Sequence, residues 1–287
     1  MIFIFFSICC SVFVSVLLKL AKRYKIDVIQ AIAWNYLAAG FLCYIIYRPP
    51  LITLYQASNP FHIYLLLGFL LPALFLVLAA SVRYSGIVRT DIAQRLSLFI
   101  PVLAAFLLYN EAPSIFKTFG IALAFTAILL SIPWNTTQNN QSAFGWISLI
   151  GVFLGLGIID ILFKQIAQYK TVNFPTSLLV IFIIAFLISL ITLLFLFLIK
   201  KIKFEWINFG CGLILGMANF GNILFYVKAH QSLATQPSVV FATMNIGVII
   251  LGSLVGIVLF KEKLSRLNYV GILLALVSIV FVVLSRK

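Results

Sequence analysis

The sequence predicts an all-α integral membrane protein in which ten transmembrane helices form two inverted five-helix repeats. Three observations lead to this prediction: the composition, the number of long apolar runs, and matches between the two halves of the chain. Of the 287 residues, 64% are hydrophobic and 9% are charged, whereas soluble domains average about 25% charged residues. The composition therefore excludes a soluble protein.

The apolar runs set the expected number of helices. A helix needs about 20 mostly apolar residues to cross a bilayer, and the chain contains ten such runs with little sequence between them. In order, they cover residues 2–18, 28–47, 63–82, 90–109, 115–132, 143–166, 176–199, 207–227, 238–260 and 268–284. The first run lacks a preceding basic segment and a small-residue cleavage site, so we interpret it as a span and not as a signal peptide.

The charged residues narrow the class further. A net charge of +14 would indicate nucleic-acid binding in a soluble domain, but here basic residues cluster in short loops at 19–25, 200–203 and 261–266. Such loops orient helices in a bilayer and meet anionic headgroups, so we expect the lipid bilayer, and no nucleic acid, as a partner. The four cysteines lie in predicted spans without the paired spacing of a zinc site; no metal and no cofactor is expected.

Matching positions in the two halves indicate an internal repeat. Lys19, near the end of the first run, matches Lys164 near the end of the sixth, 145 residues later. Glu111 after the fourth run matches Glu262 after the ninth, 151 residues later, and each glutamate is followed nine residues later by a glycine. Two independent matches at similar offsets predict that the second half copies the first.

The repeats are expected at residues 1–134 and 143–287, joined by the polar loop 135–142. Because five is an odd number of spans, consecutive copies must lie in opposite orientations in the membrane. Inverted repeats are typical of secondary transporters, whose substrate site lies near the midplane between the halves.

The distribution of basic residues predicts an orientation. The side that includes the loops after the first, third, seventh and ninth runs carries 13 basic residues, and the opposite side carries 7. The positive-inside rule therefore places both termini outside.

The stretches after the fourth and ninth runs also carry a family resemblance. Tyr109-Asn110-Glu111 with Gly120, and Lys261-Glu262 with Gly271, resemble the repeated glycine–glutamate pattern of the ten-helix EamA-type members of the drug/metabolite transporter superfamily. Asn110 and Lys261 replace the glycine that usually precedes the glutamate. The resemblance implies a secondary transporter in the cytoplasmic membrane of a bacterium. It also implies cytoplasmic termini, opposite to the charge distribution, and it leaves the substrate open.

The stretch 83–111 contains the first candidate site residues. Asp91, Gln94 and Arg95 lie on an apolar helix, where charged groups usually face a bundle interior or a watery cavity. Asp91 and Arg95 are four residues apart and share a helix face, with the acid in the favourable N-terminal position. The alternative is that the arginine extends to the headgroup region.

The first and sixth runs supply a second candidate set. Ser15 and Lys19 belong to a polar stripe on the first run, and Asp160 and Lys164 occupy matching positions on the sixth. We interpret them as walls of a substrate cavity in which the acid can be protonated during transport. The alternative is that the serines bond to their own backbone and the lysines extend to the membrane surface.

Amide and indole groups inside spans complete the candidate substrate-binding residues. They are Trp34, Asn35, Asn219, Asn222 and Asn245. In lipid an amide must find a partner, either across a helix interface or on a substrate. His62 and His230 lie near the ends of runs, and we expect both to be solvated and not to relay protons.

The leading functional hypothesis is a secondary transporter of a small polar metabolite. Basic groups outnumber acids near the spans, which favours an anionic or zwitterionic substrate, with a proton as a candidate coupling ion. The alternative is a lipid-linked carrier flippase or a non-transporting accessory membrane subunit. An enzyme is not expected, because no nucleophile–base pair or histidine-rich metal pattern is present. The oligomeric state stays open between a monomer and a homodimer.

Overall fold

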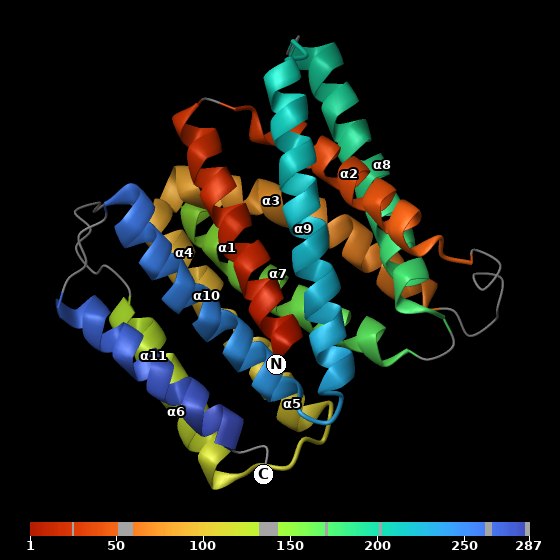
Figure 1. Cartoon of the computed structure of the whole chain (residues 1–287). Helices are drawn as coiled ribbons and strands as arrows, with labels where there is room; N and C mark the ends of the chain where they lie inside the picture. Colours follow the sequence, from red (N-terminus) through yellow and green to blue (C-terminus); the bar gives the residue numbers. More distant parts are fainter. Residues whose placement is uncertain are drawn as a thin grey trace.

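The computed structural model describes residues 1–24, 26–50, 60–131, 143–169, 172–200, 203–261 and 266–284. The regular structure in these ranges is entirely helical (Figure 1). The helices are α1 (Ile2–Arg23), α2 (Val28–Tyr47), α3 (Phe61–Ser85), α4 (Ile87–Leu96), α5 (Phe99–Leu107), α6 (Ile115–Ser131), α7 (Ala143–Gln168), α8 (Phe174–Lys200), α9 (Trp206–Ser232), α10 (Pro237–Phe260) and α11 (Arg266–Leu284). The loop 135–142, predicted to join the repeats, and Glu262 lie outside the described residues.

Nine of the ten predicted runs each form one helix, and the run 90–109 forms two. Arg89–Leu107 is still one stretch long and apolar enough to span a bilayer. Its helix is interrupted after Leu96 because Pro101 has no N–H to donate to the carbonyl of Ser97, four residues earlier. Instead, the Ser97 carbonyl accepts the N–H of Ile100 at 3.1 Å, and the Ser97 hydroxyl donates to the carbonyl of Gln94 at 2.6 Å. α4 and α5 are therefore separate helices.

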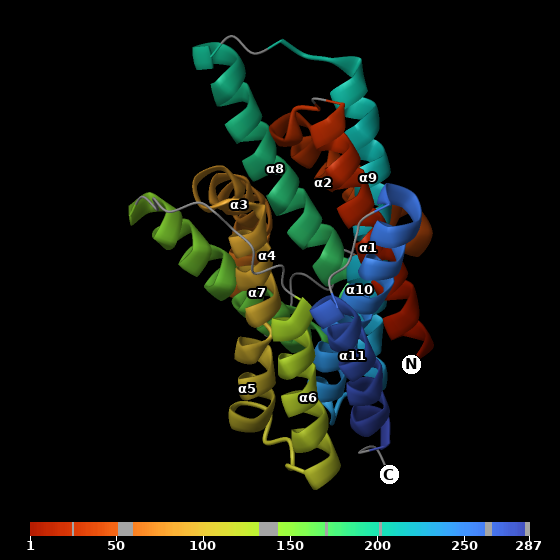
Figure 2. The ribbon, with the colours of Figure 1, turned by 90° about the vertical axis from the view of Figure 1, so that its left-hand side faces the viewer.

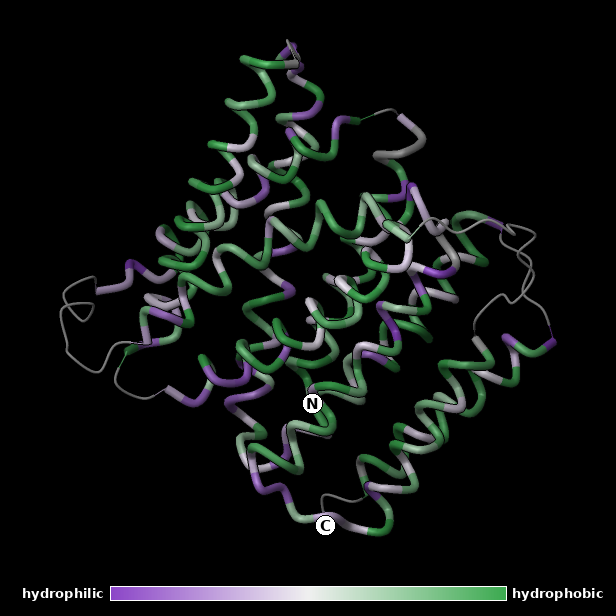
Figure 3. Tube along the Cα trace, turned by 180° about the vertical axis from the view of Figure 1, so that it is seen from behind, coloured by the Kyte–Doolittle hydropathy of each residue, from purple (hydrophilic) through white to green (hydrophobic). Residues whose placement is uncertain are grey.

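The helices have the length and composition of membrane spans. Eight stretches of the described chain are long and apolar enough to cross a bilayer, and α6 and α11 contain shorter apolar stretches, Ile115–Leu130 and Arg266–Val282. Hydrophobic residues make up most of the helices (Figure 3). Many large apolar side chains are exposed on the bundle, such as Leu198, which is 81% exposed. The chain is a multi-helix membrane protein.

The bundle is organised around α9 and α3. α1 and α2 pack against α9, α7 and α8 pack against α3, and α6 lies beside α11 on one flank (Figures 1 and 2). Two glycines allow α9 to approach α2 closely: a Cβ on Gly212 would lie 2.7 Å from the carbonyl oxygen of Ala31, and one on Gly216 would collide with that of Asn35. Small residues at such contacts are typical of membrane helices.

The connections divide between two ends of the molecule. In Figure 1 the α5–α6 connection and the α9–α10 turn lie at the lower end, towards the two termini, and the α1–α2 and α8–α9 connections lie at the upper end. The lower end holds the buried polar groups described next.

Candidate functional site

Several ionisable side chains lie buried or partly buried where α7 and α9 meet, close to the α9–α10 turn. We call them the α7–α9 cluster: Asp160 and Lys164 on α7, Tyr226 and His230 on α9, and Tyr109 just after α5. Lys164 and His230 are both 0% exposed. A lysine is almost never fully buried unless it is paired. The groups around Lys164 therefore determine what this side chain can bind.

The two charged members of the cluster bond to α9 and to the turn that follows it. The hydroxyl of Tyr226 donates to Oδ1 of Asp160 at 2.9 Å, and Nζ of Lys164 donates to the carbonyl oxygen of Ala234 at 2.7 Å. Asp160 and Lys164 are four residues apart and share one face of α7. The helix thus presents an acid and a base, one turn apart, to α9.

Aromatic rings enclose the cluster. Nζ of Lys164 lies 5.7 Å from the centroid of the Tyr109 ring, a cation–π distance. The Tyr109 hydroxyl donates to the carbonyl of Ile161 at 3.2 Å. Burial raises the pKa of Tyr109 to about 12, so the hydroxyl remains protonated and able to donate at neutral pH.

His230 is the least satisfied member of the cluster. Its ring lies between those of Tyr226 and Phe241, with centroid distances of 4.7 Å to each. Neither ring nitrogen has a hydrogen-bond partner among the described residues. Leaving a buried polar group without a partner costs about 1–3 kcal/mol, so this side chain is a candidate for contact with a ligand.

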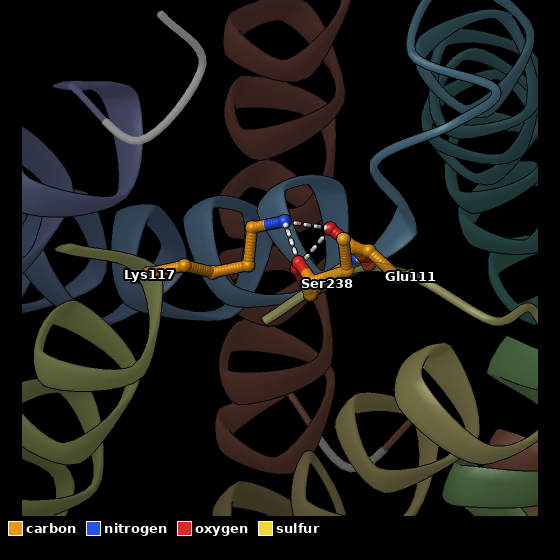
Figure 4. A network of polar contacts seen from close by, with 4 residues as sticks. Glu111, Lys117 and Ser238 are labelled. Carbon is orange, nitrogen blue, oxygen red and sulfur yellow. Dashed lines mark hydrogen bonds and ion pairs between the residues drawn. The ribbon is translucent and has the colours of Figure 1, made fainter. Parts of the chain in front are cut away.

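A second buried network adjoins the cluster and joins the α5–α6 connection to α10 (Figure 4). Glu111 accepts the N–H of Ser238 at 2.9 Å on Oε2, and the Ser238 hydroxyl at 2.7 Å on Oε1. Nζ of Lys117 lies 2.7 Å from Oε1 of Glu111 and donates to the carbonyl of Ala112 at 3.1 Å. We call this the Glu111–Lys117–Ser238 network.

The network satisfies the N-terminus of α10. The first N–H groups of a helix lack partners within the helix, and their partial positive charge favours an anion. α10 begins with Pro237, which has no N–H to satisfy, so Ser238 presents the first donor. Glu111, distant in sequence, therefore caps this helix, and Lys117 balances its charge.

The structure places other predicted site residues in helix contacts. The side chain of Asn219 donates to Oδ1 of Asn35 at 3.1 Å, joining α9 to α2. Asn222 accepts the hydroxyl of Ser7 on Oδ1 at 2.8 Å, joining α9 to α1. Asn245 donates to the carbonyl of Phe241 in its own helix. The three asparagine side chains thus bond to other protein groups, across helix interfaces or within one helix. This is the alternative to substrate binding given above.

The predicted residues Ser15, Lys19 and Trp34 also bond or pack locally. The Ser15 hydroxyl donates to the carbonyl of Ser11 at 3.1 Å. The exposed Lys19 places Nζ 3.8 Å from the Phe260 ring centroid. Trp34 packs edge-on against neighbouring aromatic rings, Phe209 at 5.0 Å and Phe204 at 6.1 Å.

The predicted pair on α4 is present. Nε of Arg95 bonds to Oδ2 of Asp91 at 2.8 Å, and the side chains are 24% and 38% exposed, respectively. Gln94, also on α4, is partly exposed. This helix packs on α7 and α3, outside the α7–α9 cluster.

Sequence reasoning missed several residues of the two buried groups. His230 was expected to be solvated, and this was wrong because the α9–α10 turn and the aromatic rings cover it; His62 is exposed, as expected. Tyr226, Lys117 and Ser238 were not singled out. Pro237 at the first position of α10 signals a helix start, but the residue that caps it is not visible in the local sequence.

Comparisons with known proteins identify a solved structure with the same fold and a relative with a similar sequence. No protein-family model matches the chain. A solved crystal structure shares the fold, with a TM-score of 0.73 over 99% of this chain and 96% of its own, at 12% identity. An uncharacterized protein of Haemophilus influenzae is 45% identical over 280 residues, which are 96% of this chain and 94% of that protein. The chain therefore belongs to the family of this Haemophilus influenzae protein.

Proposed function

We propose that the protein is a secondary transporter of a small polar metabolite, of the EamA type within the drug/metabolite transporter superfamily. The α7–α9 cluster carries the proposal: Lys164 is fully buried, and Asp160 lies one helical turn away. Ionisable groups inside membrane proteins usually mark a substrate or ion pathway. Transport proceeds by alternating access between residues 1–134 and 143–287, in the cytoplasmic membrane.

Backbone conformation supports two related halves. Asn110 and Lys261, the residues before the two repeated glutamates, both adopt left-handed conformations, with φ of 49° and 54°. Glycine adopts this conformation most readily, which accounts for the glycine in the family pattern.

Helix packing supports the same arrangement. Exchanging the first five spans with the second five turns the contact of α1 with α9 into that of α7 with α3. The same exchange turns the contact of α2 with α9 into that of α8 with α3, and it leaves the pairs α2–α8 and α6–α11 unchanged.

The cluster suits a substrate with an anionic group, alone or together with a cationic one. Lys164 offers an ammonium group, and Asp160 offers a carboxylate that a proton can neutralise during the transport cycle. A proton is accordingly the candidate coupling ion.

Uptake into proteoliposomes tests the proposal. The purified full chain is reconstituted and offered carboxylates, phosphate esters, amino acids and organic cations, with and without a pH gradient. We expect saturable uptake of an anionic or zwitterionic solute, and loss of its pH-gradient dependence in Asp160→Asn. Lys203→Met, which changes an exposed lysine between α8 and α9, serves as the control. Uptake of organic cations alone would refute the substrate preference, and unchanged pH dependence in Asp160→Asn would indicate a uniporter.

One observation favours a second candidate, a flippase for a lipid-linked carrier. A shallow groove lies between α2, α3 and α8. Its lining is largely apolar: Ile29, Ile32, Pro72, Leu76, Ser189 and Thr192. Its apolar lining could contact the acyl or isoprenoid chain of such a carrier from the lipid side. Transfer of a fluorescent lipid-linked sugar between leaflets, without uptake of soluble solutes, would support this function over metabolite transport.

A further inference from the structure

Among the described residues, no protein group forms a hydrogen bond with the buried ring nitrogens of His230. Lys164 reaches the same part of the chain, because its Nζ bonds to the carbonyl of Ala234, four residues after His230. Packing between Tyr226 and Phe241 fixes the plane of the ring. The imidazole is therefore held in place, and its N–H group has no acceptor among the described residues.

Lys164 also has N–H donors that no described protein group accepts. An ammonium group carries three N–H donors, and among the described residues one of them bonds to a protein acceptor, the carbonyl of Ala234. That acceptor is neutral and belongs to the turn between α9 and α10, where Ala234 and Thr235 are exposed. An incoming oxyanion can replace the carbonyl and form a stronger, charge-assisted bond.

The neighbouring acids are already engaged. Asp160 accepts the hydroxyl of Tyr226, and Glu111 is balanced by Lys117 and by the N-terminus of α10. Their negative charge is thus partly compensated by groups other than Lys164.

We propose that Lys164 and His230 form an oxyanion subsite that binds the carboxylate or phosphate group of the substrate. This inference rests on the transport function proposed above and assigns the anionic part of the substrate to two residues. Lys164 supplies the charge, and His230 supplies a second, fixed N–H donor. Asp160 then faces the remainder of the substrate from one turn away on α7.

Thermal unfolding of the purified full chain in detergent tests the subsite. The added anions are acetate, inorganic phosphate, glycerol phosphate and a short-chain phosphatidic acid, each compared with chloride at equal ionic strength. The variants are Lys164→Met, His230→Phe and His230→Gln; the two histidine variants ensure that at least one folded protein reports on the imidazole. His62→Gln and Lys203→Met are the matched controls, because both side chains are exposed.

We expect at least one anion to raise the melting midpoint of the wild type in a saturable manner. The apparent affinity should fall about tenfold or more in Lys164→Met and in His230→Phe, because each loses a hydrogen bond to a charged group. The fall should be smaller in His230→Gln, because its side-chain amide can still donate. The controls should retain it. Stabilisation by acetate, by the water-soluble phosphates or by phosphatidic acid identifies the source of the oxyanion as a carboxylate, a soluble phosphate or a lipid headgroup.

Two results would overturn the subsite: no specific stabilisation of the wild type by any of the four anions, or equal stabilisation of the wild type and Lys164→Met. Uptake of another solute in proteoliposomes could still be present in either case, and the transport function would then stand without the subsite. Conversely, loss of stabilisation in the variants together with no flux of any solute would confirm the subsite and reject transport.

Discussion

Two ion pairs of this protein have similar lengths and very different surroundings. In α4, Arg95 and Asp91 are joined at 2.8 Å with side chains 24% and 38% exposed. In the Glu111–Lys117–Ser238 network, Lys117 and Glu111 are joined at 2.7 Å with side chains 5% and 1% exposed. Water and headgroups can replace the first pair, whereas no solvent reaches the second.

The two pairs also differ in what they connect. Asp91 and Arg95 lie one turn apart on a single helix, so their contact constrains α4 alone. Glu111 and Lys117 flank the start of α6, and the same carboxylate holds Ser238, 127 residues away, on α10. Burial and connectivity, rather than distance, should therefore determine the energetic effect of each pair, and four substitutions test this comparison.

The largest effect is expected for Glu111→Gln. This change keeps the shape of the side chain but leaves Lys117 buried without its partner, and breaking a buried pair in this way costs about 3–5 kcal/mol. The free energy of unfolding in detergent, from denaturant titration of the full chain, measures the loss. A loss no larger than that of Asp91→Asn would contradict the comparison.

The second effect concerns the coupling between the two charges. Adding Lys117→Met to Glu111→Gln removes the unpaired ammonium, and apolar replacement of buried pairs is often close to neutral. The double variant should therefore recover most of the stability that Glu111→Gln loses. A double-mutant cycle measures this coupling, and strictly additive losses would show that the two charges act independently.

A smaller effect is expected for Ser238→Ala. The N–H of residue 238 can still donate to Glu111, while the bond from the hydroxyl is lost. Hydrogen bonds to charged groups contribute about 1.5–3 kcal/mol, so the unfolding free energy should fall by less than in Glu111→Gln. Ser15→Ala is a suitable control, because that hydroxyl is exposed and bonds only within its own helix. Equal losses in the two serine variants would argue against a specific role of α10 capping.

The smallest effect is expected for Asp91→Asn. Partly exposed pairs four residues apart on a helix contribute about 0.3–0.5 kcal/mol, and salt weakens them further. The unfolding free energy should change by no more than this amount, and less at high ionic strength. A large, salt-independent loss would mean that the pair is embedded in the protein more deeply than its exposure indicates.

The sequence by itself determined the class of the protein and the positions of its helices. Every predicted run became helical because the cost of an unpaired peptide group in lipid enforces helices wherever about 20 apolar residues follow one another. The Asp91–Arg95 contact was also predictable, since the two residues lie one turn apart on the same face of one helix. The one break, at Ser97, required knowing that Pro101 would interrupt the helix instead of being tolerated within it.

Only the tertiary structure decided which polar groups share the buried site. Ser238 is 127 residues from Glu111, Ala234 is 70 from Lys164, and Tyr226 is 66 from Asp160. No local pattern encodes such distances, because the relevant partners are chosen by how α7, α9 and α10 pack. The sequence places a lysine or a histidine in a span, but the surrounding helices decide whether it meets lipid, water or another buried group.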